Sequence, residues 1–296
     1  MTQKIIGLVL LFIFSNATAE TLKLAWETKG FKAPESMLFD KERNVIYVSN
    51  VDGKPMTKDG KGSIALLSVD GKKADQEWVT GLNAPKGLAL VKNILYVSDI
   101  NSLVAIDVET KKIIHHYSHE KAKFLNDVVA DKDGNVYVSD FLDHTIYRLK
   151  DGKFETWLAD RKLETPNGLL VEDNKLLVGS WGIMTDGFAT KVAGHMKSVD
   201  LKTKKITSLG NGKPVGNLDG IESDGKDGYF ATDWIAGSIL HIKANGEFKT
   251  LLDIEQGSAD LGVITKLDVI TKKRVPSLLL IPMMNDNVVR AYNVLH

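Results

Sequence analysis

Residues 165–181 read TPNGLLVEDNKLLVGSW, two short apolar runs separated by the polar turn EDN. This pattern is typical of two strands joined by a tight turn. Residues 124–140, FLNDVVADKDGNVYVSD, repeat it, with DKDGN as the turn. In each stretch an asparagine, Asn126 or Asn167, stands just before the first apolar run. The chain therefore repeats a hairpin, and a repeated unit of this kind indicates the whole architecture.

Six such stretches follow one another along the chain. Their opening polar residues are separated by 51, 40, 41, 52 and 41 residues, and further strand-like segments follow each stretch. About four strands in a unit of roughly 40–50 residues predict a β-propeller, and the chain length allows six blades. The stretches are 33–50, 84–99, 124–140, 165–180, 217–233 and 258–269, opened by Glu35, Lys86, Asn126, Asn167, Asp219 and Asp260.

The two ends of the repeat are complementary. The sixth unit has room for only three strands, the last of which contains NVVRAYNVL, whereas the segment TLKLAWET at 21–28 is a spare strand before the first unit. We expect the N-terminal strand to complete the last blade, which leaves an all-β, six-bladed ring without free sheet edges.

The opening residue of each stretch begins the innermost strand of its blade, so all six side chains should meet at the mouth of the central channel. Carboxylate and amide oxygens at such a place suit one divalent cation, with Ca²⁺ expected and Mg²⁺, Mn²⁺ or Zn²⁺ as alternatives. Asn, Asp and Gly also build turns, which is the competing explanation of the pattern. That explanation does not account for Glu35, a poor turn residue.

These short motifs resemble the senescence marker protein/gluconolactonase/regucalcin family of six-bladed propellers. The resemblance rests on Glu35 in APES, Asn126 in LND, Asn167 in PNGL and Asp219 in LDGI, and it follows the blade order across the chain. Paraoxonases and NHL-repeat proteins share parts of the same pattern. The resemblance implies a single divalent cation in the channel, with Glu35, Asn167 and Asp219 as its ligands.

The resemblance also implies roles in catalysis. Asp219 is the expected general base, and Asn126 the expected contact with substrate or metal. A bound cation polarises a lactone or ester carbonyl and lowers the pKa of bound water, and a carboxylate beside it can accept the proton. The reaction expected is hydrolysis of a lactone or ester, or its reversal.

Two positions depart from the sugar-lactone members of that family. Those members carry an arginine where this chain has Phe124, and NDG where it has Asn126-Asp127-Val128. A polar sugar acid therefore loses an expected partner, which leaves room for a more apolar substrate. Lys86 adds a cation to the ring, either to bind a substrate carboxylate or to form an ion pair with Asp219 or Asp260.

Two connections between inner strands are long, 51–63 in the first blade and 181–195 in the fourth. These blades lie opposite one another in a six-fold ring, so both loops should rise over the mouth as binding loops. Trp181, Met184 and Phe188 would then contact the substrate. Of the histidines, only His195 falls near such a loop.

The first residues predict a secretory signal peptide. Lys4, the apolar run IIGLVLLFIF at 5–14 and the A-x-A arrangement at 17–19 are its three parts, with cleavage after Ala19 and a propeller domain over 20–296. A membrane anchor is the alternative, but the run is short for one. The chain has no cysteine, which excludes disulfides, thiol catalysis and cysteine-bound zinc.

The sequence thus predicts a periplasmic or secreted, metal-dependent lactonase or esterase acting on a small molecule. Lysine plus arginine and aspartate plus glutamate are equal at 38 each, which gives no basic footprint for nucleic acid. We expect no membrane contact after cleavage. The alternative is a non-catalytic, NHL-like propeller that binds a ligand or a protein partner in the cell envelope.

Overall fold

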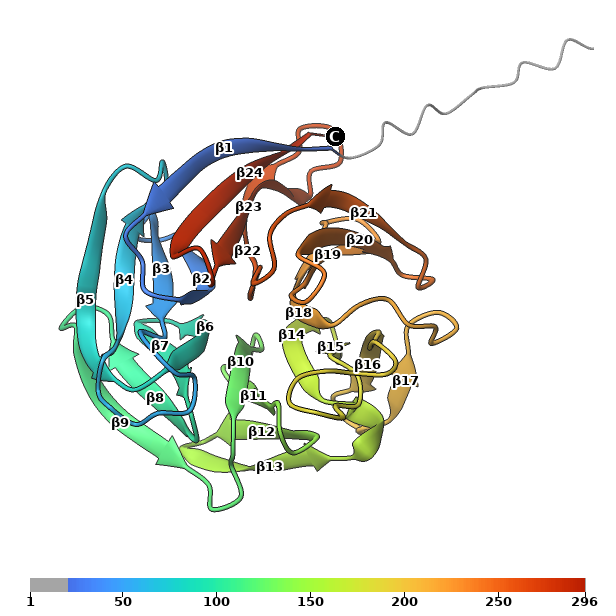
Figure 1. Ribbon diagram of the computed structural model, residues 1–296, viewed down its shortest axis with the longest axis horizontal. Coiled ribbons are helices and arrows are strands. Elements are labelled where there is room, and N and C mark those ends of the chain that lie inside the picture. Colours follow the sequence, from blue (N-terminus) through green and yellow to red (C-terminus); the bar gives the residue numbers. More distant parts are fainter. Residues whose placement is uncertain (1–20, 296) are drawn as a thin grey trace, which may run out of the picture.

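The computed structural model describes residues 21–295 as six four-stranded antiparallel sheets around a central axis (Figure 1). This confirms the predicted six-bladed β-propeller. The predicted signal peptide lies outside the described residues, and within 21–295 no helix is long and apolar enough to cross a membrane.

Each blade runs from an inner strand at the axis to an outer strand at the rim. Blade one is β2 (Pro34–Asp40), β3 (Val45–Asn50), β4 (Gly62–Ser68) and β5 (Ala74–Leu82), and blade two is β6 (Pro85–Val91), β7 (Ile94–Asp99), β8 (Ser102–Asp107) and β9 (Lys112–Ser118). Blade three is β10 (Leu125–Ala130), β11 (Val136–Asp140), β12 (Thr145–Lys150) and β13 (Lys153–Ala159). A short 3₁₀ helix, Arg161–Leu163, leads into blade four.

The remaining blades follow the same order. Blade four is β14 (Pro166–Glu172), β15 (Lys175–Ser180), β16 (Met196–Asp200) and β17 (Ile206–Ser208), and blade five is β18 (Leu218–Ser223), β19 (Gly228–Asp233), β20 (Ser238–Lys243) and β21 (Phe248–Asp253). Blade six is β22 (Gly262–Leu267), β23 (Arg274–Met283) and β24 (Val288–Leu295), completed by β1 (Thr21–Lys29).

The ring closes through its two ends, as the sequence predicted. β1 pairs antiparallel with β24, from Thr21 opposite Leu295 to Lys29 opposite Val288. Arg290 on β24 reinforces the seam, because its guanidinium pairs with Glu27 of β1 at 2.9 Å and with Glu255 of blade five at 2.6 Å. The pairing gives the last blade its fourth strand and joins the two ends of the described chain in one sheet.

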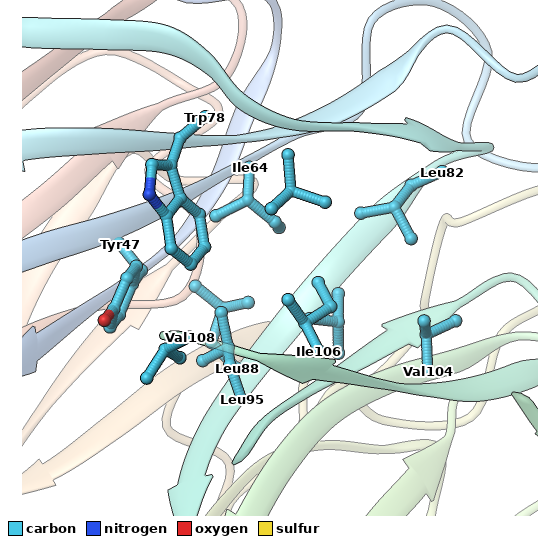
Figure 2. Close-up of a cluster of buried hydrophobic side chains, with 11 residues drawn as sticks. Tyr47, Ile64, Trp78, Leu82, Leu88, Leu95, Val104, Ile106 and Val108 are labelled. Carbon is cyan, nitrogen blue, oxygen red and sulfur yellow. The ribbon is translucent and has the colours of Figure 1, made fainter. Parts of the chain in front are cut away.

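Apolar cores lie between blades rather than within them. Six clusters of buried side chains each join two neighbouring blades. Figure 2 shows the one between blades one and two, where Tyr47 and Trp78 of the first blade cover Leu88 and Leu95 of the second. Because every sheet packs on two neighbours, inner strands are buried on both faces and read as apolar runs rather than as strict alternations.

The pairing of the first two strands shifts at the same place in five blades. The irregularity lies between Pro34 and Met37 in blade one, and at the corresponding positions of blades two to five. Such a bulge leaves two residues opposite one on the partner strand. In each of these blades the opening residue of the repeat falls inside the bulge.

Hydroxyl groups from the second strand satisfy the backbone of these bulges. The N–H of Ser36 donates to the Ser49 hydroxyl at 3.0 Å, that of Asp127 to Ser139 at 2.9 Å, and that of Gly220 to Thr232 at 3.0 Å. The Thr232 hydroxyl also donates to the carbonyl of Ala259 at 2.9 Å and so ties blade five to blade six. Blades one, three and five therefore each use a Ser or Thr near the end of the second strand to satisfy the bulge.

Blade contacts at the axis are too close for side chains at several bulges. A Cβ on Gly168 would lie 2.0 Å from the carbonyl oxygen of Asp219, and one on Gly220 would lie 2.2 Å from the backbone nitrogen of Leu261. The glycine of the PNG and LDG motifs thus serves the packing of neighbouring blades, separately from the polar residue before it.

Replacing Thr232 by valine tests this account of the bulge. Thr232→Val keeps the shape but leaves the Gly220 N–H and the Ala259 carbonyl without partners, so it should lower the free energy of unfolding by about 2–3 kcal/mol. Thr232→Ser keeps the hydroxyl and should lose clearly less. Urea unfolding followed by tryptophan fluorescence measures both, and an equal loss in the two variants would contradict the assignment.

Candidate active site

The polar residues predicted for the site come together at one end of the channel. Glu35, Lys86, Asn126, Asn167 and Asp219 all line a cavity of about 320 Å³. Each begins the inner strand of its blade, so the bulges of blades one to five deliver them to the same level. Their side chains form the floor of this cavity, and all five residues are buried, with exposures of 1–6%.

The floor contains oxygen atoms without partners. The Asn126 amide donates from Nδ2 to Oδ1 of Asn167, which leaves Oδ1 of Asn126 buried and unbonded. Oε2 of Glu35 is likewise buried without a hydrogen-bond partner. Unsatisfied buried acceptors are costly and rare in native proteins, so two in one cavity indicate a place where something binds.

The two carboxyl groups of the floor are held in an environment that opposes ionisation. Burial raises the pKa of Glu35 well above its ordinary value, Asp219 and Asp260 add to the shift, and Lys86 opposes it. Burial and Asp260 similarly raise the pKa of Asp219, with the Asn167 side chain acting in the opposite direction. Added positive charge near these groups would relieve the repulsion.

Lys86 supplies one positive charge but forms no ion pair with either aspartate considered from the sequence. Its ammonium group donates to the carbonyls of Ala84 at 2.9 Å and Pro55 at 3.2 Å, and it lies 4.5 Å from the ring centre of Phe124. The alternative of an ion pair with Asp219 or Asp260 is therefore wrong. Burial lowers the pKa of Lys86 to about 8, against the influence of Glu35 and Asp99.

Above the polar floor stands a collar of apolar side chains. Each blade contributes the residue that directly follows its second strand. Three blades give aliphatic residues and three consecutive blades give aromatic ones. The members are Val51, Ile100, Phe141, Trp181, Trp234 and Met284.

The aromatic half of the collar forms one wall of the cavity. Phe141 lies edge-on to Trp181 with ring centres 5.2 Å apart, Trp234 lies 6.2 Å from Trp181, and Phe124 lies 5.7 Å from Phe141. Phe188 packs on Phe141 from above at 5.7 Å. The predicted contacts Phe124 and Trp181 therefore belong to this wall.

Both long loops reach the cavity, as predicted from their places in opposite blades. Gly53 and Pro55 come from the loop of blade one, and Phe188 from the loop of blade four. The Trp181 indole fixes the second loop by donating to the Phe188 carbonyl at 2.9 Å. Met184 packs behind the aromatic wall rather than lining the cavity.

Asp260 does not join the floor, contrary to the expectation for the sixth opening residue. β22 begins only at Gly262, so Asp260 precedes the strand; its N–H donates to the Glu35 carbonyl and its carboxylate accepts from the Ser36 hydroxyl at 2.6 Å. These contacts turn the side chain into the channel below the floor. There it lines a second space of about 210 Å³ with Ser36, Asp127 and Glu222.

The sequence reasoning missed this lower layer. A bulge directs two consecutive residues towards the axis, so Ser36 follows Glu35 and Asp127 follows Asn126, one layer down. Asp127 is fixed by the N–H groups of Val128 and Leu169, which it accepts at 2.6 and 2.5 Å. The shift in strand pairing that produces this lower layer leaves no recognisable pattern in the amino-acid sequence.

Other polar residues have structural roles away from the cavity. His195 bonds to the Ser208 hydroxyl at 2.9 Å and does not line the cavity. Asp99 accepts from the backbone N–H groups of Asn83 and Ala84, just before β6, and Asp140 accepts from those of Lys123 and Phe124, just before β10.

The donor set limits which residues could hold a metal ion. Within 21–295, no three His, Cys, Asp or Glu side chains are grouped so that they could hold one. Glu35 and Asp219 would need amide oxygens from Asn167 or Asn126 to complete a coordination shell. Carboxylate and amide oxygens are ligands for a hard cation such as Ca²⁺, Mg²⁺ or Mn²⁺.

No protein-family model matches the chain, and no curated protein sequence matches it. Solved structures do resemble it. A gluconolactonase from Xanthomonas campestris gives a TM-score of 0.63 at 12% identity, covering 93% of this chain and 89% of its own. A virginiamycin B lyase from Staphylococcus aureus gives 0.60 at 13% identity, covering 94% and 100%.

A chain of the nidogen–laminin complex also resembles the protein, with a TM-score of 0.57 at 17% identity over 72% of this chain and 76% of that one. These likenesses show the propeller fold and agree with the gluconolactonase-like motifs. Two named enzymes and a component of a protein complex share that fold, so the function must be argued from the site.

The lower layer makes stability depend on pH. Burial and Asp260 raise the pKa of Glu222 to about 8, and burial raises that of Asp260 to about 7. Since the folded chain then binds more protons than the unfolded one, its stability should fall as pH rises from about 4 towards 8. Both side chains are partly exposed, so we expect a loss of only about 1–2 kcal/mol for the metal-free protein.

Urea unfolding in a chelator at several pH values measures this dependence. Glu222→Gln removes one of the two groups and should flatten the profile, whereas Glu120→Gln on the exposed surface should leave it unchanged. A metal-free protein that becomes more stable between pH 5.5 and 8 would contradict the account.

Proposed function

We propose that the protein is an exported hydrolase that opens a lactone or ester and depends on one divalent cation at the mouth of the propeller. The observation that supports this most is the combination of partnerless buried oxygens on Glu35 and Asn126 with an aromatic wall in a single cavity. A concave, mostly apolar site with a few convergent polar groups is typical of small-molecule sites.

The residues present fit a cation. Glu35 and Asp219 supply two carboxylates from blades one and five, and Asn126 and Asn167 supply amide oxygens from blades three and four. Ca²⁺ is the ion we expect, with Mg²⁺, Mn²⁺ and Zn²⁺ as alternatives. Oδ1 of Asn167 accepts one hydrogen bond from Asn126 and would offer its second lone pair to the ion.

When bound, the cation would polarise the substrate carbonyl and lower the pKa of a water molecule. Asp219 would accept the proton of the attacking water as general base, which its position on the floor allows. Asn126 would orient the substrate through its free Oδ1 or its amide N–H groups. The aromatic wall limits the access of bulk water, which strengthens polar interactions inside the cavity.

The surroundings of the floor favour a substrate with an apolar or aromatic body rather than a sugar. Phe124 stands where sugar-lactone enzymes of the resembling family carry an arginine, and it packs on Phe141 instead of offering hydrogen bonds. Lys86 has two of its three donors on backbone carbonyls. The third remains for a carboxylate on the substrate or on the hydroxy-acid product.

Metal dependence gives the first test. The purified protein should retain about one equivalent of a divalent cation, and a chelator should abolish turnover across a panel of lactones and aryl esters. Asp219→Asn should lower kcat by about 10²–10⁴ because the general base is lost. Asp133→Asn on the exposed surface is the control.

Elemental analysis and steady-state kinetics separate the alternatives. Absence of any stoichiometric cation would overturn the proposed centre. A bound cation without turnover of any panel member, together with a co-purifying protein, would instead favour the non-catalytic binding propeller.

The role of Lys86 is tested with a matched pair of substrates. Lys86→Met should lower kcat/KM about 10–100-fold for an aryl lactone that bears a carboxylate, and leave its methyl ester nearly unaffected, because only the charged group bonds the ammonium. With wild-type protein, KM for the carboxylate substrate should rise above pH 8, where Lys86 loses its proton. Equal losses on both substrates would refute an anion-binding role.

A further inference from the structure

The two most exposed large apolar side chains of residues 21–295 are neighbours on one hairpin, far from the candidate site. Ile270 is 87% exposed and Val269 74%, and Leu267 beside them is 56% exposed. They occupy the tip of the β22–β23 hairpin of blade six. Exposed apolar residues scattered singly need no explanation, but three on one tip do.

Two other turns of the chain show that this tip does not need apolar residues. The sequence DVITKK at 268–273 has close relatives in DVETKK at 107–112 and DLKTKK at 200–205. In all three, the aspartate accepts from the backbone N–H groups two and three residues later and from the threonine hydroxyl. The fifth residue has a positive φ of 58–59° in each.

The differences between the three turns lie at the second and third residues. Val108 is buried, and Leu201 packs against the core, each donating its N–H to a turn of the same blade. Val269 instead faces solvent. At the third place the related turns carry the charged residues Glu109 and Lys202, whereas blade six carries Ile270. The turn geometry explains Asp268 and Thr271 but not Ile270.

The hairpin also projects beyond its neighbours. Beyond the bulge of blade one, its first two strands hold four residue pairs, from Met37 to Asp40. The first two strands of blade six hold six pairs, from Gly262 to Leu267. Two additional residues extend a strand by about 7 Å. Inner strands run away from the mouth, so the tip projects from the face opposite the cavity.

Positive charge surrounds the apolar tip. Lys266, Lys272, Lys273 and Arg274 are all exposed on the hairpin. Arg274 holds its guanidinium on Thr265, at 2.7 Å from the hydroxyl and 2.6 Å from the carbonyl. Asp268 is the only carboxylate within the hairpin, and it is turned onto its own backbone. An apolar tip within a basic ring matches an anionic lipid surface.

The same face receives the start of the described chain. β24 runs away from the mouth and ends at Leu295, opposite Thr21 at the start of β1. Figure 1 shows the C-terminal end of β24 beside the start of β1. The apolar run at 5–14 precedes this point in the sequence. The tip and the point where the chain enters the ring therefore lie on one face of blade six, while the cavity opens on the other.

We infer that the blade-six hairpin docks on an anionic phospholipid surface, inserting Val269 and Ile270 while Lys266, Lys272, Lys273 and Arg274 bind lipid phosphates. The mouth of the propeller then points away from the membrane and stays open to solutes. This contact departs from the expectation that no membrane contact follows cleavage, and it does not depend on the proposed reaction.

Vesicle co-sedimentation tests the inference with the protein purified from a periplasmic extract. Vesicles of phosphatidylcholine containing about one third phosphatidylglycerol should bind it at least ten-fold more tightly than pure phosphatidylcholine, since each basic residue contributes about five-fold. Val269→Ser/Ile270→Ser and Lys272→Gln/Lys273→Gln should each weaken binding several-fold. All variants share the N-terminus of the wild type, so its contribution cancels.

The related turn supplies a matched control. Lys204→Gln/Lys205→Gln removes the same two charges from the same backbone conformation in blade four, and it should leave vesicle binding unchanged. An equal loss in this control, equal binding to both vesicle types, or no binding would overturn the inference. So would self-association of the wild type that Val269→Ser/Ile270→Ser abolishes, because it would assign the tip to a second copy of the chain.

Discussion

The convergence of six inner strands on one axis is the constraint on which the rest of this structure depends. At that radius the blades come so close that glycine is required beside the axis, as at Gly168 and Gly220. The bulge at the start of the inner strand in blades one to five allows this approach and turns two consecutive residues towards the channel. The floor of the cavity follows from that local irregularity, and so does the place of Asp127 in the acidic layer below it.

Much of this arrangement could be predicted from the sequence, because a repeated sequence pattern indicates a repeated structural unit. Aligning the six repeated stretches predicts the number of blades and the closing strand. It also predicts that Glu35, Asn126, Asn167 and Asp219 meet at one place. Phe141 and Trp234 could also have been found, since each directly follows the second strand of its blade, as Trp181 does. Comparing the residue after the second strand across the six repeats, as well as the opening residue, would have identified the collar.

Other features depend on contacts between residues of different repeat units, which the repeat pattern does not indicate. The orientation of Asp260 depends on a hydrogen bond from Ser36, which is 224 residues away in the sequence. The contacts of Lys86 depend on a loop carbonyl, that of Pro55, and on Phe124 of the next blade. Such contacts join residues from different units, and the spacing within a unit cannot predict them.

The seam between β1 and β24 has a consequence for how the protein folds. The first strand of the ring can find its place only after the last strand exists, so the sixth blade cannot form until the whole chain is present. Pairing of residues so distant in sequence slows folding, because loop closure costs entropy before the contacts form. Five blades can assemble in order during synthesis or export, but the ring as a whole gains its final cooperativity in one late step. Until the N-terminal strand β1 pairs with β24, blade six has only three strands and β24 is left as an unpaired edge strand.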